Sequence, residues 1–382
     1  MRFSDITGNP ELKKQIVNQA LNHHLPHAIM LLGKPGGGAL PMALATAQFI
    51  FCENKQGHDS CGQCSACLKV SNLQHPDLHF SFPVYKTDPN STAPPISDDF
   101  FRLFKEYVLA HPYGNDQEWL ESVGSEKKGN ITAAECRQII RKLQLRTFES
   151  EYKILILWYP EYLGEEGNIL LKLIEEPTDK TILIMVAENL DHVLQTIQSR
   201  TQLYPLRSIE DKEILDTLLQ KGIGETQATQ VSRLAEGNMH YAYALLEEED
   251  HNLIDTLRDW LNFMYSNKGV ELNDWSLEIA DKTKNIQKNF IEYVINLLEH
   301  LLRSRQIGPD KLNLLDSEVR IIENLKLRNL SDFRIHEITQ LLNESIHQIN
   351  RNANSKILFH SLSLRIQQIL LQKKQAAHAQ MS

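Results

Sequence analysis

Short apolar runs alternate with amphipathic stretches along the first half of the chain. The runs have the length and composition of strands that are buried on both faces. The strand candidates are residues 28–32 (AIMLL), 153–157 (KILIL) and 181–187 (TILIMVA), with weaker signals at 78–84 and 201–206. Helical patterns lie between them, at residues 132–145 and 167–177. This alternation predicts an α/β fold, in which helices cover both faces of a parallel sheet.

The two helical patterns carry recognisable boundaries. Thr132 and Glu135 have the spacing of a capping box at the start of residues 132–145. Pro177 ends the second pattern, because proline cannot continue a helix.

Strand signals end near residue 208, where the pattern becomes helical. Three short helices separated by glycines are predicted at residues 209–222, 225–237 and 239–249. Beyond them only long amphipathic patterns occur, such as residues 289–305. The sequence therefore predicts three domains. They are an α/β domain at residues 1–207, a small helical domain at 208–250 and an all-helical domain at 251–382.

Residues 85–130 interrupt the alternation of strands and helices. The stretch TDPNSTAPPISDD is polar and rich in proline, which is typical of a loop. We interpret residues 85–130 as an insertion and expect its helical part to be peripheral.

Composition and charge narrow the class of protein. The 382 residues are 42% hydrophobic and 23% charged, as in ordinary soluble globular proteins. The N-terminus lacks the basic and apolar regions of a signal peptide, and no apolar run approaches the ~20 residues of a membrane helix. We therefore expect a cytoplasmic protein. A net charge of −9 argues against a protein that coats nucleic acid by itself.

Four of the five cysteines are bunched near residue 60. They are Cys52, Cys61, Cys64 and Cys67, with the spacing C-x8-C-x2-C-x2-C. Four thiolates so placed suit a closed tetrahedral zinc site, which would be structural. A disulfide is disfavoured in the cytoplasm, a redox pair does not need four cysteines, and the spacing is unusual for an iron–sulfur cluster. Cys136 lies in a helical pattern and is interpreted as a buried hydrophobe.

A glycine-rich segment, GKPGGGAL at residues 33–40, follows the first predicted strand. Gly33, Gly36 and Gly38 suit a loop whose backbone N–H groups surround phosphate. The phosphate-loop pattern requires Lys and then Ser or Thr after the last glycine, but Ala39 and Leu40 stand there. Pro41 is tolerable because it falls in the first turn of the next helix.

These motifs occur together in a known order. The glycine loop, the four cysteines, HPDLHF (75–80), ILLKLIEEP (169–177) and SRT (199–201) follow one another as in bacterial clamp-loader subunits. The chain resembles the delta-prime subunits of the DNA polymerase III clamp loader, with the ATP-hydrolysing tau/gamma subunits as the nearer alternative. The similarity runs motif by motif over residues 1–245, and residues 351–366 are similar to the last helix of the family's C-terminal domain.

The resemblance implies an architecture and partners. The fold would be an AAA+ domain of RecA-like type with a zinc module at about residues 50–75. A three-helix lid domain and a helical collar domain would follow it. The family's subunits form a hetero-oligomer of tau/gamma and delta with delta-prime, which loads the sliding clamp on primed DNA in an ATP-dependent manner.

The resemblance also identifies four nucleotide-handling positions, and each is altered here. Ala39 replaces the phosphate-loop lysine and Leu40 the magnesium-binding hydroxyl. Where an Asp-Glu pair should hold magnesium, the chain has Trp158 and Tyr159, which carry no negative charge at neutral pH. Ala187 or Glu188 stands at the polar sensor position, and His240 replaces an arginine of the lid. Because phosphoryl transfer depends on such charges, we expect no intrinsic ATPase and no productive ATP binding.

One functional motif is retained, at Ser199, Arg200 and Thr201. In the family, a Ser-Arg-Cys motif carries an arginine that reaches the nucleotide of the neighbouring subunit, and Thr201 here replaces the cysteine. The alternative is an ordinary surface arginine in a loop salt bridge. With the other motifs in order, we interpret Arg200 as a trans-acting arginine finger.

Two other functions remain as alternatives. One is an active tau/gamma-like ATPase, which Ala39 and Trp158 disfavour. The other is a zinc-dependent nucleic-acid-binding protein, which the acidic charge disfavours, as does the lack of a Lys/Arg cluster near the cysteines.

Overall fold

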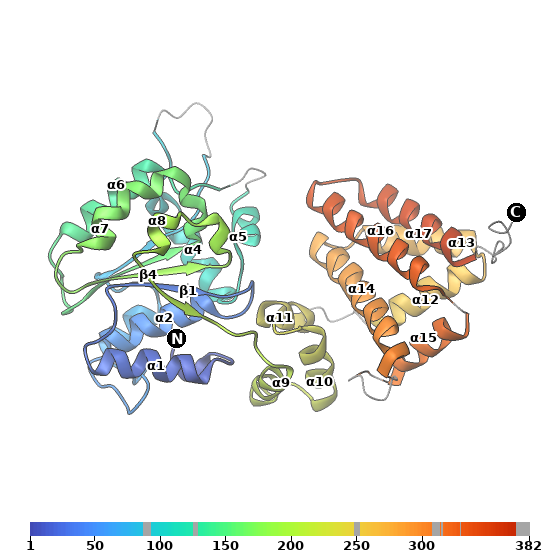
Figure 1. The fold of residues 1–382 in the computed structure, drawn as a ribbon, viewed down its shortest axis with the longest axis horizontal. Helices are drawn as coiled ribbons and strands as arrows, with labels where there is room; N and C mark the ends of the chain where they lie inside the picture. The colour runs from blue at the N-terminus through green and yellow to red at the C-terminus, as the bar shows by residue number, and fades with distance from the viewer. Residues whose placement is uncertain are drawn as a thin grey trace, which may run out of the picture. The chain divides into compact units, whose positions relative to one another are not determined.

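A computed structural model describes residues 1–86, 93–124, 129–247, 253–307, 314, 316–328 and 330–371 (Figure 1). The chain divides into two compact units, Met1–Glu247 and Glu248–Ser382. No helix among the described residues is long and apolar enough to cross a membrane.

A parallel sheet of five strands forms the centre of the first unit, in the order β2-β3-β4-β1-β5. The strands are β1 (Ala28–Leu32), β2 (Leu78–Ser81), β3 (Lys153–Trp158), β4 (Thr181–Ala187) and β5 (Gln202–Pro205). All five predicted strands are therefore confirmed, although the candidate at 78–84 ends early. Pro83 has no N–H, and the Phe82 N–H donates to Ser97 Oγ at 3.1 Å instead of to a neighbouring strand.

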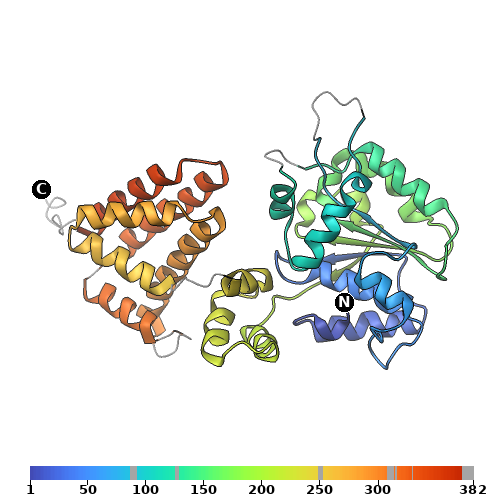
Figure 2. The same cartoon turned by 180° about the vertical axis from the view of Figure 1, so that it is seen from behind.

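Side chains alternate between the two faces of the sheet, so each face has its own core. Ile156, Ile184 and Trp158 belong to one core, and Leu157 and Met185 to the other. The first face is covered by η1 (Phe3–Asp5), α1 (Pro10–Leu21), α2 (Ala39–Phe51), α3 (Ser65–Ser71), α4 (Ser97–Ala110) and α5 (Asp116–Ser122). The opposite face is covered by α6 (Ala133–Gln144), η2 (Pro160–Leu170), α7 (Leu171–Glu175), η3 (Leu190–His192) and α8 (Gln195–Gln198). Figure 2 shows the two layers of helices from behind.

Two predicted helix details need correction. Only half of the capping box forms: Thr132 Oγ1 accepts from the Glu135 N–H at 3.2 Å, but the Glu135 carboxylate accepts from the Ser97 N–H at 2.8 Å. The pattern at 167–177 is not one α-helix. It begins inside the 3-10 segment η2, and only α7 is α-helical.

The helical part of residues 85–130 is not peripheral, so that expectation was wrong. Phe104 and Trp119 are fully buried, and Phe104 stacks on Phe82 with ring centroids 3.8 Å apart. Trp119 Nε1–H donates to the Pro83 carbonyl at 2.8 Å. These aromatic side chains cover the β2 edge of the sheet, which explains their burial. The proline-rich start of the segment falls partly outside the described residues.

Three helices complete the first unit: α9 (Asp211–Gln220), α10 (Glu225–Leu234) and α11 (Met239–Glu247). They share a small core with Tyr113, which comes from the loop between α4 and α5. The second unit contains the helices α12 (Leu253–Tyr265), α13 (Gly269–Ala280), α14 (Lys284–Ile307), α15 (Asp316–Leu327), α16 (Asp332–Asn350) and α17 (Ser355–Leu371). Its core includes Trp260 stacked on Trp275, with centroids 4.9 Å apart.

Candidate functional site

The four bunched cysteines converge next to the first core of the sheet. Cys52 caps the C-terminus of α2, Cys61 lies in the following loop, and Cys64 and Cys67 lie at the start of α3. Their sulfur atoms all lie within 4.8 Å of one another, so the four residues together could hold a metal ion.

The sulfur geometry fits a tetrahedral metal centre. A Zn–S bond of 2.3 Å implies S···S separations of about 3.8 Å, and Cys61 Sγ lies 3.9 Å from Cys67 Sγ. Backbone N–H groups of Gln63 and Cys64 donate to Cys61 Sγ at 3.4 and 3.3 Å, and these hydrogen bonds lower the pKa of the Cys61 thiol to about 6. Such donors stabilise the thiolate form that binds metal.

The glycine loop contains two residues with positive φ angles. Gly36 and Gly38 have φ angles of 68° and 91°, which L-residues rarely adopt. The Gly33 N–H donates to the Ala187 carbonyl at 3.0 Å, so the loop leaves directly from the end of β1. Ala39 and Leu40 are buried at the start of α2, and Pro41 lies in the first turn of that helix, as predicted.

The space in front of the loop is filled by the protein itself. Tyr113 packs against Gly38, where an added Cβ would lie 3.2 Å from Tyr113 Cε1. Its hydroxyl accepts from the Thr7 N–H at 3.0 Å. On the other side, an added Cβ at Gly36 would lie 1.7 Å from Asn238 Oδ1. The cavity that remains measures about 20 Å³, room for about one water molecule.

Trp158 and Tyr159 close the same space from the end of β3, and both are 2% exposed. Tyr159 has a φ of 58°, and its hydroxyl donates to Glu188 Oε1 at 2.5 Å. Ala187 is the fully buried last residue of β4, so Glu188 is the polar residue that faces this space. His240, on α11, lies 2.7 Å from Glu118 Oε1 of α5.

Glu188 gives this space an unusual acid. Burial, supplemented by the nearby carboxylates of Asp116 and Glu161, raises its pKa to about 8, against the opposing hydrogen bond from Tyr159. The folded chain therefore holds a proton on Glu188 at neutral pH, whereas an unfolded chain releases it near pH 4.3.

We expect Glu188→Gln to flatten the pH dependence of stability. Since the folded pKa is raised, the contribution of Glu188 is complete below the unfolded pKa and is lost as pH rises toward 8. An amide cannot ionise, but its oxygen can still accept from Tyr159. Urea unfolding should therefore show that the stability lost between pH 5 and pH 8 is about 3–4 kcal/mol smaller in the variant than in the unmodified chain. The exposed Glu165→Gln is the control, and equal pH slopes for both variants would contradict the assignment.

Arg200 lies at the amino-terminal ends of the strands, whereas the glycine loop follows the carboxyl-terminal end of β1. It occupies the turn between α8 and β5, and the strand register pairs Gln202 with Ile29. Gly33 is four residues further along β1, about 13 Å at the rise of a strand. Arg200 therefore cannot serve the glycine loop of its own chain. Its Nε–H donates to Glu175 Oε1 at 2.5 Å.

The HPDLHF motif has a structural role. The Asp77 carboxylate accepts from the backbone N–H groups of Phe148, Glu149 and Ser150 at 2.5 to 2.9 Å. These bonds fix the loop that leads into β3. His75 is buried and stacks on Phe51 with ring centroids 4.0 Å apart.

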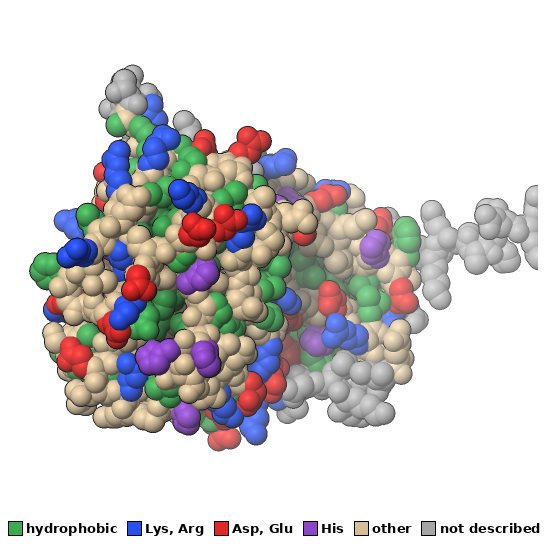
Figure 3. All heavy atoms as spheres, turned by 60° about the vertical axis from the view of Figure 1, so that its left-hand side comes forward, with side chains coloured by type: hydrophobic (Ala, Val, Ile, Leu, Met, Phe, Trp, Pro, Cys, Tyr) green, Lys and Arg blue, Asp and Glu red, His purple; other side chains and the backbone are tan. Residues whose placement is uncertain are grey.

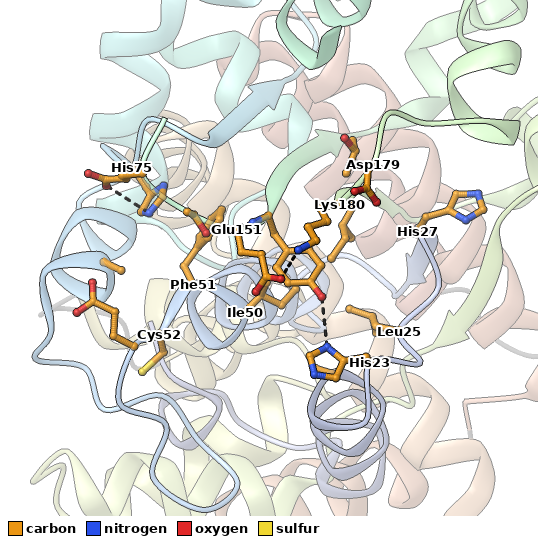
Figure 4. Close-up of a pocket in the computed structure, with 18 of the residues that line it drawn as sticks. His23, Leu25, His27, Ile50, Phe51, Cys52, His75, Glu151, Asp179 and Lys180 are labelled. Atoms are coloured by element: carbon orange, nitrogen blue, oxygen red, sulfur yellow. Dashed lines mark hydrogen bonds and ion pairs between the residues drawn. The ribbon is translucent and has the colours of Figure 1, made fainter. Parts of the chain in front are cut away.

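A cavity of about 760 Å³ lies beside the cysteine module (Figure 4). Four of its charged side chains form ion pairs, Lys69 with Glu149 at 2.5 Å and Lys180 with Glu151, and the lining also contains Lys55, Glu53 and Asp179. Figure 3 likewise shows positive and negative side chains interspersed over the face turned toward the viewer. Neither feature offers the concentrated positive charge that phosphate groups would need.

Several residues that shape the site could not be assigned a role from the sequence. Tyr113, Glu118 and Asn238 fill or brace the space before the glycine loop, and Glu175 binds Arg200. Tyr113 and Glu118 come from the segment interpreted as an insertion. Because their contacts lie more than a hundred residues away in the chain, periodicity and short motifs could not indicate them.

Comparison with known proteins identifies a family. A family model described as DNA polymerase III, delta subunit, matches residues 8–210. A DNA polymerase III subunit delta' from Bacillus subtilis (strain 168) is 22% identical, over 85% of this chain and 94% of the relative. The subunit delta' of Escherichia coli (strain K12) is 23% identical over 94% of each chain. The chain is also similar to the subunit tau of Bacillus subtilis, at 22% identity over 65% of this chain and 37% of the relative.

Proposed function

The chain belongs to the DNA polymerase III delta subunit family, and on that premise we propose that it is a non-catalytic, delta-prime-type subunit of a cytoplasmic clamp loader. Its partners would be tau/gamma and delta subunits in a hetero-oligomer. Through that complex it would support ATP-dependent loading of a sliding clamp on primed DNA. The likeness to relatives named subunit delta' over most of their length supports this assignment.

The filled nucleotide site carries the proposal. An ATPase of this kind needs a lysine, a metal-holding carboxylate pair and an arginine around the phosphates. Here Ala39, Trp158 and His240 stand at those positions, and the remaining cavity measures about 20 Å³. Tyr113 and Asn238 occupy the space that phosphates would need. This arrangement disfavours a tau/gamma-like active subunit.

The retained chemistry would act on a neighbour. Arg200 lies at the amino-terminal ends of the strands, opposite the ends that carry its own glycine loop, and an adjacent subunit could present its nucleotide there. A guanidinium there would stabilise the charge that develops on the transferred γ-phosphoryl group. Ser199 and Thr201 would hold the turn, since the Thr201 hydroxyl lies 3.2 Å from the Ile197 and Gln198 carbonyls.

The remaining parts would have structural roles. Residues 1–207 would form the AAA+ α/β domain, with a structural zinc ion held by Cys52, Cys61, Cys64 and Cys67. Residues 208–250 would be the lid. It contacts the glycine loop directly, since the Met239 N–H donates to the Gly36 carbonyl at 3.0 Å. Residues 251–382 would be the collar that assembles with other subunits.

We expect the purified chain neither to bind nor to hydrolyse ATP. Titration with a fluorescent ATP analogue should give no saturable signal up to millimolar concentration. Ala39→Lys should not restore binding, because Tyr113 and Asn238 still fill the space and no carboxylate pair holds magnesium. Stoichiometric binding by the unmodified chain would overturn the non-catalytic assignment.

Deleting residues 251–382 should abolish co-purification with the tau/gamma and delta subunits, since the long amphipathic helices of this region would form the assembly surface. The measurement is affinity capture of a tagged chain from reconstituted mixtures. Zinc content of the shortened chain serves as the control for a folded first unit. Retained capture would place the assembly surface in residues 1–250.

A further inference from the structure

Three of the five N–H groups of Arg200 are engaged within its own chain. Its Nε–H donates to Glu175 Oε1 at 2.5 Å. Its Nη1 donates to the Thr196 carbonyl at 3.0 Å and to Ser199 Oγ at 3.2 Å. A guanidinium has five N–H donors, so three are used. Within the part of the chain that the structure describes, the two N–H groups of Nη2 have no acceptor.

We propose that Glu175 is a positioning residue, which orients Arg200 so that Nη2 presents its two N–H groups to a phosphoryl group bound by the adjacent subunit. This inference rests on the proposed function of Arg200 as a trans-acting finger. Arginine side chains have many rotamers, and fixing one before the neighbour arrives removes an entropic cost from the reaction. The three bonds together leave one orientation of the planar group.

The location of Glu175 supports this role. It is the last residue of α7, where a carboxylate gains nothing from the helix dipole. The preceding residues, Leu173 and Ile174, are buried in the second core and hold α7 against the sheet. Glu175 is therefore presented from a fixed element, and Arg200 from the turn after α8, which packs against α7.

An ordinary surface ion pair would have a similar exposure and a similarly small effect on stability. The two side chains are 35% and 47% exposed, so their attraction contributes little to the stability of the chain. A merely structural pair would therefore leave ATP hydrolysis in the assembled complex unchanged when either partner is replaced. A positioning residue would alter the catalytic rate of the neighbouring site while folding and assembly stay normal.

The test uses the reconstituted complex with four single variants of this chain, Arg200→Ala, Glu175→Ala, Glu175→Gln and Glu176→Ala, and one double variant. Glu176 is the matched control, because it is the next residue, is exposed and does not contact Arg200. We expect Glu175→Ala to lower kcat for DNA-stimulated ATP hydrolysis about 10-fold, less than Arg200→Ala, with KM for ATP unchanged. Glu175→Gln should retain activity within about 3-fold, because its amide oxygen can still accept from Nε–H.

The outcomes separate this inference from the proposed function. If Arg200→Ala leaves hydrolysis unchanged, the finger itself is wrong and Glu175 has nothing to position. If Arg200→Ala lowers kcat but Glu175→Ala equals Glu176→Ala, the positioning role alone is overturned. Loss of activity by Glu175→Gln as large as by Glu175→Ala would also overturn it. The double variant Arg200→Ala/Glu175→Ala should be no worse than Arg200→Ala, because the two residues act as one unit.

Discussion

Replacing Arg200 with alanine should lower ATP hydrolysis at the neighbouring site about 10³-fold, if the chain supplies a finger there. The guanidinium would stabilise charge on the transferred phosphoryl group. Folding should not change, because the ion pair with Glu175 is partly exposed and contributes little to stability. The measurement is steady-state ATP hydrolysis by a complex whose other ATPase sites are inactivated by substitution of their P-loop lysines. Only the site beside Arg200 then turns over.

Two further variants sharpen the Arg200 experiment. Arg102→Ala is the matched control, because Arg102 is an exposed arginine that faces Glu106 on its own helix. It should leave hydrolysis unchanged. Arg200→Lys should rescue poorly, because an ammonium group cannot bond Glu175, Thr196 and a phosphate with the same planar geometry. A normal rate with Arg200→Ala would reduce Arg200 to a surface residue.

The sheet could be predicted because its signal is local. β1, β3 and β4 are buried on both faces, and such strands are continuous apolar runs. The end of β2 could not be placed in the same way. Phe82 and Val84 are as apolar as strand residues, but their backbone groups bond Ser97 and Asn130. The end of β2 therefore depends on residues that lie 15 and 46 positions further along the chain.

The candidate site was predictable only in part. The cysteine spacing and the missing lysine are local facts, and the convergence of the four sulfur atoms was foreseen from spacing alone. The side chains that fill the space before the glycine loop could not be predicted. Tyr113 belongs to a segment that looked like a peripheral insertion, yet it is 5% exposed and joins the core of α9–α11. The polar and proline-rich residues at the start of this segment indicate only a loop. They carry no information about the aromatic helices that follow.

Cys64→Ser should remove the metal ion and destabilise the first unit, the second large effect that we expect. A structural zinc site contributes its binding energy to folding, about 10 kcal/mol or more in isolated zinc-finger peptides. Here the loss of stability should be smaller than that binding energy, because α2 and α3 also pack on the sheet core and are held there without the metal. We therefore expect a loss of stability of about 3 kcal/mol or more, with about one zinc ion per chain before the substitution and much less after it.

The loss should spread to the N-terminus but not to the second unit. The Asp59 carboxylate of the module accepts from the Phe3 and Ser4 N–H groups at 3.0 and 2.9 Å, so a loosened module releases residues that cover α2. Limited proteolysis should accordingly cleave the variant within residues 53–60 while helices α12–α17 stay protected. Cys136→Ala is the control: it removes a buried thiol from the other face of the sheet, and zinc should be retained. Unmodified protein that contains no metal and shows four titratable thiols would contradict the zinc assignment, because nothing else would then hold the four sulfur atoms of the module together.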